Sequence, residues 1–232
     1  MNETIAIKNA KVTSFREKLK KFFRFVFEEG IRFPAYILIH PLKGFDIFKR
    51  EKKAKTSIAL AFIFILCIIQ ILEVQFSGFI VNQRDINEIN TPFEIAYIVV
   101  PILLFTVSNW SATSFLDGKG KMNEIFMMIC YSLFPLIFAK IFSIIISNTI
   151  IQSEVGLYNL IMGLGSFLTL YMIFFGLISI HEYGLLRCIC SILLTVLAML
   201  IVVFTAILAY DLFQKIYGFV YTIYREISLR YM

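Results

Sequence analysis

The polar and apolar positions of the chain alternate between long uncharged runs and short charged stretches. Each uncharged run is long enough, at 1.5 Å per residue in a helix, to cross a hydrocarbon layer of roughly 30 Å. The sequence therefore predicts an all-α polytopic membrane protein built as a five-transmembrane-helix bundle. The predicted spans are residues 57–80, 95–116, 125–147, 156–180 and 188–210.

The connections between the predicted spans are short, so consecutive spans must be antiparallel and the connections must alternate between the two sides. They are residues 81–94, 117–124, 148–155 and 181–187. With a cytoplasmic N-terminus, 14 + 2 + 1 = 17 Lys and Arg residues lie inside and 1 + 0 + 3 = 4 lie outside. The positive-inside rule therefore predicts a multi-pass protein of the plasma membrane with a cytoplasmic N-terminus and an extracellular C-terminus.

Composition agrees with this pattern, because 59% of the residues are hydrophobic and only 16% are charged. A soluble domain has roughly 25% charged residues. The net charge of +6 is concentrated before the first span, so we relate it to membrane orientation and expect no nucleic-acid partner.

Residues 1–56 form a basic segment with two apolar patches. Phe15, Leu19, Phe22 and Val26 fall on one helical face, and five of the seven residues 49–55 are basic. We expect amphipathic interfacial helices on the anionic inner leaflet; a flexible basic arm with one short helix is the alternative. The expected lipid contacts are Lys49, Arg50, Lys52, Lys53 and Lys55.

The other two predicted units are the membrane domain, residues 57–212, and an aromatic amphipathic tail, residues 213–232. The tail carries Phe213, Tyr217, Tyr221 and Tyr224. Aromatic side chains favour the membrane–water interface, so we expect the tail to lie along the outer interface.

The predicted inside loop contains Asp117, Gly118, Lys119 and Gly120. A phosphate-binding loop needs G-x-x-x-x-G-K followed by Ser or Thr, between a strand and a helix, and neither condition is met here. We interpret the loop as a tight reversal in which the glycines provide positive φ values.

His181 and Glu182 end the fourth span on the same side as this loop. With Asp117 they could hold a metal or relay protons, but no metal-ligand spacing is satisfied. We interpret them as hydrogen-bonding groups at a helix end and expect no metal and no cofactor. The sequence contains no set of catalytic residues or nucleotide fingerprint, so we do not expect an enzyme.

Four stretches of the sequence resemble the Yip (Ypt-interacting protein) domain family, and specifically its Gram-positive bacterial branch. They are "HPLKGFDIFKREKKAK", "NWSATSFLDGKGK", "CYSLFPLIF" and "IHEYG". The resemblance covers residues 34 to 215 and implies a five-span α-helical membrane protein with a cytoplasmic N-terminus. Eukaryotic relatives engage Rab-type GTPases in vesicle trafficking; bacteria have no such vesicles, so the resemblance implies a fold more than a function.

Polar residues inside the predicted spans are candidates for functional sites, because burying charge in a bilayer is costly. Glu73 and Lys140 share a depth of roughly 22–24 Å from the cytoplasmic boundary, so they either form an ion pair or reach the outer interface separately. A second set lies in the inner half of the membrane, where we expect hydrogen bonds between helices. That set is Ser108, Asn109, Tyr131 and Ser132.

We therefore expect a non-enzymatic scaffold or accessory protein that binds anionic lipid and a membrane or cytoplasmic protein partner, for example a transporter complex. A small transporter or channel is the first alternative, suggested by the polar residues within the spans. A membrane-shaping protein, acting through its N-terminal helices, is the second. A homo-oligomer is compatible with the sequence.

Overall fold

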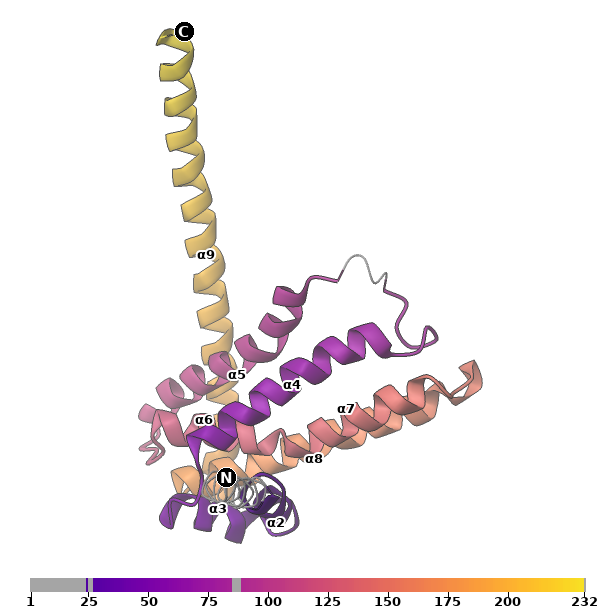
Figure 1. Ribbon diagram of the computed structural model, residues 1–232. Helices are drawn as coiled ribbons and strands as arrows, with labels where there is room; N and C mark the ends of the chain where they lie inside the picture. Colours follow the sequence, from indigo (N-terminus) through magenta and orange to yellow (C-terminus); the bar gives the residue numbers. More distant parts are fainter. Residues whose placement is uncertain (1–23, 25–26, 85–88, 232) are drawn as a thin grey trace, which may run out of the picture.

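The computed structural model describes Arg24, residues 27–84 and residues 89–231, and this part of the chain contains helices and connections but no strand. Five helical segments are long and apolar enough to cross a membrane. The all-α, five-span architecture is thus confirmed (Figure 1). The spans are α4 (Thr56–Phe76), α5 (Thr91–Ser114), α6 (Met122–Ser132) with α7 (Phe134–Ser147), α8 (Val155–His181) and α9 (Leu185–Tyr231).

The third span is divided into α6 and α7 at Leu133. Pro135 lies in the first turn of α7. A proline has no backbone N–H, and its ring collides with the carbonyl four residues earlier, so it interrupts a continuous helix. The break places the end of α6 deep in the core and sends α7 along α8.

The helices before the first span pack into the bundle. α2 (Phe33–Ile39) and α3 (Pro41–Arg50) follow a short π-helix, Glu28–Arg32. They bury Ile37, Phe45 and Phe48, and α3 lies against α8. Their main apolar faces therefore contact protein, whereas we expected lipid contact. The expected face at Phe15, Leu19, Phe22 and Val26 lies outside the described residues.

α7 and α8 pack closely through small residues. A Cβ atom added to Gly165 of α8 would lie 2.3 Å from the Cβ of Ala139 in α7. Ser143 and Ser147, on the same face of α7, are also buried. Small side chains let two membrane helices approach at this distance, which increases their van der Waals contact.

α9 is one helix of 47 residues. Its first turns pack against α5, and its later part leaves the bundle (Figure 1). The helix is continuous across residue 212, where the sequence suggested that a separate tail begins. It contains no proline, and an ion pair between Asp211 and Lys215, 2.8 Å long, connects successive turns across this point.

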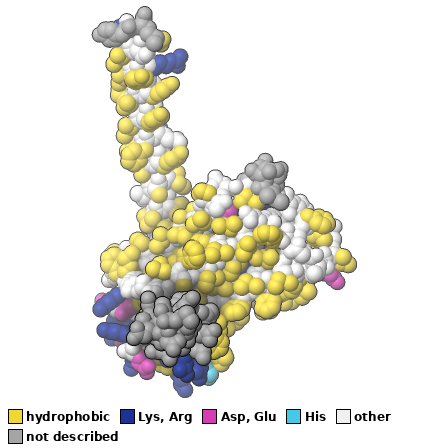
Figure 2. Space-filling view, viewed as in Figure 1, with side chains coloured by type: hydrophobic (Ala, Val, Ile, Leu, Met, Phe, Trp, Pro, Cys, Tyr) yellow, Lys and Arg dark blue, Asp and Glu magenta, His cyan; other side chains and the backbone are white. Residues whose placement is uncertain are grey.

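Charged and apolar side chains are separated on the surface. Figure 2 shows hydrophobic side chains over the spans and Lys and Arg gathered near α3. We call the end of the molecule that carries these Lys and Arg side chains the basic end; it comprises α2, α3 and the connections 115–121 and 182–184. The distal end comprises the connections 77–90, in its described part, and 148–154.

Candidate functional site

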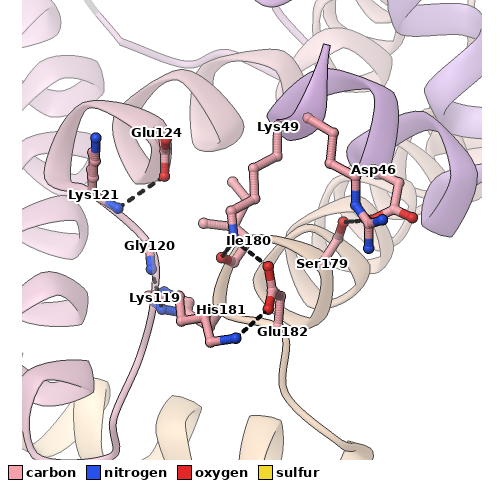
Figure 3. A network of polar contacts seen from close by, with 11 residues as sticks. Asp46, Lys49, Lys119, Gly120, Lys121, Glu124, Ser179, Ile180, His181 and Glu182 are labelled. Carbon is pink, nitrogen blue, oxygen red and sulfur yellow. Dashed lines mark hydrogen bonds and ion pairs between the residues drawn. The ribbon is translucent and has the colours of Figure 1, made fainter. Parts of the chain in front are cut away.

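The carboxylate of Glu182 joins two lysines at the basic end (Figure 3). Lys49 of α3 donates to Glu182 Oε1 at 3.0 Å, and Lys119 of the α5–α6 connection donates to Oε2 at 2.6 Å. The hydrogen bond from Lys119, followed by that from Lys49 and by the charges of both, lowers the pKa of Glu182 to about 2. Glu182 therefore connects α3, the α5–α6 connection and the end of α8.

Lys49 also donates to the backbone carbonyl of Ile180 at 2.8 Å. The last carbonyls of a helix have no partner within the helix and carry its negative dipole end, so a lysine there is stabilising. The side chain of Lys49 is only 16% exposed. The ammonium group of Lys49 is therefore held at the end of α8, and its expected contact with lipid stays a prediction.

The other basic residues expected at lipid are more exposed. Arg50 pairs with Asp46 at 3.6 Å, and Lys53 lies 5.1 Å from the ring centre of Phe33. Lys55 pairs with Glu29 at 3.3 Å, and Lys52 is exposed. Arg50, Lys52 and Lys53 therefore form an exposed basic surface at the end of α3 and in the α3–α4 connection.

His181 makes hydrogen bonds with both of its ring nitrogens. The backbone N–H of Gly120 donates to Nδ1 at 3.3 Å, so the proton of the neutral ring is on Nε2. Nε2 then donates to the side-chain oxygen of Asn109 at 3.1 Å. The amide nitrogen of Asn109 donates to the hydroxyl of Thr195 in α9 at 2.9 Å. This buried chain of bonds connects α8, α5 and α9.

Gly118 and Gly120 are needed for space, and neither has a positive φ. The expected role of these glycines in the reversal is therefore wrong. Added Cβ atoms would lie 2.7 Å from His181 Nδ1 at Gly118 and 2.7 Å from Ile180 Cγ2 at Gly120. The positive φ, 55°, belongs to Asp117, a residue type that tolerates this region.

In the described part of the chain, the four polar residues expected in the inner half of the membrane make their hydrogen bonds with other groups and not with one another. Asn109 bonds to α8 and α9, whereas Ser132 donates to the carbonyl of Met128 in its own helix. The hydroxyl of Ser108 is buried without a hydrogen-bond partner in the described part of the chain. Asn109 thus makes hydrogen bonds between helices, but with α8 and α9, because equal depth does not specify which helix faces are in contact.

Tyr131 lies in an aromatic core. Its ring makes edge contacts with Phe48 at 5.3 Å and Phe62 at 5.4 Å, measured between ring centres. Its hydroxyl accepts a hydrogen bond from the backbone N–H of Lys55 at 3.3 Å. Offset and edge-to-face ring pairs add roughly 0.5–1.5 kcal/mol each beyond burial. Tyr131 therefore fixes α3 and the start of α4 to α6.

Glu73 and Lys140 are brought together at the distal side of the spans, where they form an ion pair and a hydrogen bond. Lys140 also donates to the side-chain oxygen of Gln70 at 2.8 Å. Tyr158 of α8 donates to the other oxygen of Glu73 at 3.2 Å. Gln70 and Tyr158 could not be recognised in the sequence as members of this site, because uncharged polar residues within apolar runs carry no charge signal.

Three of the four stretches that resemble a known family meet at the basic end. They supply Lys49, then Asn109 with the two glycines, and then His181 with Glu182. The fourth stretch supplies Tyr131, which packs against Phe48. Phe48 is the residue that precedes Lys49 in α3. A comparison with protein-family models matches the Yip1 domain to residues 35–207.

The chain belongs to the Yip1 family. The matched residues cover more than half of the chain and include α3, the basic-end contacts and the first part of α9. No match was found among curated proteins, and none among solved structures. The Yip1 domain is not a known enzyme family. Family membership thus establishes an integral membrane protein of the Yip type.

The polar groups at the basic end of this Yip1 domain mainly bond to one another and so hold the helices together. Glu182 is already paired with two lysines, and His181 uses both ring nitrogens. In the described residues, no group of three or more potential metal ligands was found. The arrangement can join helices and fix the position of α3 and its basic surface.

Proposed function

We propose that this Yip1-family protein is a non-enzymatic scaffold of the plasma membrane, with its basic end in the cytoplasm. In this proposal the basic surface binds anionic lipid head groups and an acidic region of a protein partner. The surface comprises Arg50, Lys52 and Lys53. The partner is either another membrane protein, such as a transporter complex, or a cytoplasmic protein.

The position of the aromatic core is the observation that best supports a scaffold. Along α4, Phe62 precedes Gln70 by eight residues, which is roughly 12 Å of helix. Along α6 and α7, Tyr131 precedes Lys140 by nine residues. Buried rings thus occupy the bundle on the basic-end side of the Glu73–Lys140 pair. A transporter or channel would need a polar path through this region, so the packing favours a scaffold.

The rigid attachment of α3 supports partner binding at the basic end. Phe45 and Phe48 anchor one face of α3 in the bundle, and Lys49 fixes its end to α8. The exposed basic residues therefore lie at a defined position and need little ordering on binding. Preorganised surfaces bind more tightly because less conformational entropy is lost.

The test is crosslinking in native membranes with a photoreactive residue at Lys52, followed by purification of the full chain. We expect one recurring protein partner, whose capture falls in the variant R50E/K52-photoreactive/K53E. The matched control is reversal of Lys215 and Arg225 on the later part of α9, with the same photoreactive residue. A protein that purifies alone, or equal capture in both variants, contradicts the proposal.

Flux measurements separate the scaffold from the alternative functions. Vesicles containing the protein should pass ions and small solutes no faster than empty vesicles. Flux above that level would favour a transporter or channel. The membrane-shaping alternative depends on residues 1–33, and vesicle tubulation that is lost on their deletion would favour it.

A further inference from the structure

Six polar side chains form a connected chain at the distal side of the spans. The Glu73–Lys140 pair continues through Gln70, whose amide donates to Glu94 Oε2 at 2.9 Å. Arg84, in the α4–α5 connection, donates to Glu94 Oε1 at 2.9 Å. With Tyr158, the chain joins α4, α5, α7, α8 and this connection.

These side chains line a cavity of about 490 Å³. The side chain of Glu94 is 7% exposed, whereas that of Arg84 is 66% exposed, so the polar chain runs from the buried wall to an exposed cation. Phe93 and Tyr97 also line the cavity, and both are largely exposed. The cavity therefore combines buried charges, an exposed cation and aromatic rings.

Ser77 also lines the cavity, and its hydroxyl is buried without a hydrogen-bond partner in the described part of the chain. An unpaired buried hydroxyl is unfavourable unless a ligand or water satisfies it. Buried ion pairs are likewise weak contributors to stability compared with apolar packing. Both features indicate that the cavity has a role beyond holding the helices together.

The charges around the cavity define the ligand class. Two carboxylates, Glu73 and Glu94, oppose the two cations Lys140 and Arg84, so the formal charges sum to zero. A ligand with net charge would disturb this balance, whereas a zwitterion would not. Each carboxylate can accept further hydrogen bonds, and the Arg84 guanidinium has donors beyond the one that it gives to Glu94.

We propose that this cavity binds a phosphoethanolamine group, as in a zwitterionic phospholipid. The phosphate would lie at Arg84, because guanidinium groups match phosphate oxygens. The ammonium would lie toward Glu94 and the rings of Phe93 and Tyr97, where carboxylates and aromatic faces both attract cations. The cavity lies near the end of α4 and the start of α5, the level at which phospholipid head groups are found. This assignment is independent of the proposed scaffold function.

The test measures which lipids the delipidated full-length protein retains, by native mass spectrometry. Phosphatidylethanolamine and phosphatidylglycerol are supplied in equal amounts. We expect retention of phosphatidylethanolamine to exceed that of phosphatidylglycerol about tenfold. The variants Arg84→Gln and Tyr97→Ala should each reduce this preference several-fold, while the control Lys215→Gln, which removes an exposed cation of α9, leaves it unchanged.

Two further measurements complete the test. Soluble phosphoethanolamine is added as a competitor. If it displaces the bound phosphatidylethanolamine, the cavity recognises the head group alone, and a soluble compound can be its ligand. If the phosphatidylethanolamine is retained, the ligand is the membrane lipid. A photoreactive phosphatidylethanolamine head group should crosslink to residues 93–97 or 158–162. Equal retention of the two lipids, unchanged preference in both variants, or crosslinks confined to α9 would overturn the proposal.

Discussion

Replacement of Asn109 by alanine should strongly destabilise the protein, because this side chain joins three helices. Asn109 is fully buried. Its oxygen accepts a hydrogen bond from His181 Nε2 at 3.1 Å, and its nitrogen donates to Thr195 at 2.9 Å. Asn109→Ala removes both bonds and leaves the N–H of His181 without its acceptor.

The expected loss follows from these contacts. Interhelical hydrogen bonds in membrane proteins average roughly 0.6 kcal/mol each, so two contribute about 1.2 kcal/mol. Leaving the His181 N–H buried and unpaired costs about 1–3 kcal/mol. The Thr195 hydroxyl still donates to the carbonyl of Ser191 at 2.7 Å, so no second group is left unpaired. The free energy of unfolding should therefore fall by about 2–4 kcal/mol.

Equilibrium unfolding in mixed detergent micelles measures this change. The threonines of α9 provide a matched pair, because Thr195 and Thr205 both donate to the carbonyl four residues earlier. Thr195→Val removes the acceptor of the Asn109 amide and should cost about 1–2 kcal/mol. Thr205 is exposed, and Thr205→Val should change stability by less than about 0.5 kcal/mol. An effect of Asn109→Ala below about 0.5 kcal/mol would refute the reasoning.

Three further predictions concern the close contacts and ion pairs. Gly120→Ala should cost about 1–3 kcal/mol by overpacking, whereas Gly156→Ala, with no atom within 4 Å of the added Cβ, should stabilise α8; thermal unfolding compares them. Charge reversal at either Glu73 or Lys140 should lower the free energy of unfolding by about 3–5 kcal/mol, because it leaves a buried charge without its partner. The double reversal should restore part of the expression and stability. The absence of any rescue would argue against the pair. Glu182→Gln should lower the free energy of unfolding by an amount that is constant from pH 7 to 5 and disappears as the pH falls toward 2. The pKa of Glu182 is lower in the folded protein than its ordinary value of 4.5, so its carboxylate stabilises the fold above pH 4.5 and loses this effect as it is protonated. A change in the difference between pH 7 and 5 would contradict this assignment.

The five spans could be predicted from the sequence because the bilayer imposes a length and polarity rule on each helix. Predicted residues 156–180 lie within α8, Val155–His181. Span prediction did not reveal the division of the third span, since Pro135 changes the backbone without changing hydropathy. It also did not reveal the packing of α3, because Phe45 and Phe48 are equally suited to lipid and to protein contact.

Only part of the candidate site could be predicted. Glu73 and Lys140 share a depth and have opposite charges, and both facts can be read from the sequence. Thr195 was missed because a threonine in a membrane helix usually bonds to its own backbone, as Thr195 also does. Its contact with Asn109 depends on how α9 is rotated about its axis, which hydropathy does not determine.

Glu182 illustrates how backbone geometry and charge combine at the basic end. α5 and α8 end in the same way: Asp117 and Glu182 have φ values of 55° and 57°, and the next residue donates its N–H to the carbonyl five residues earlier. Glycine would adopt this conformation with less strain. Glycine at position 182 would, however, provide no carboxylate for Lys49 and Lys119. The strained backbone therefore places a carboxylate where it can pair with a lysine of α3 and a lysine of the α5–α6 connection at the same time.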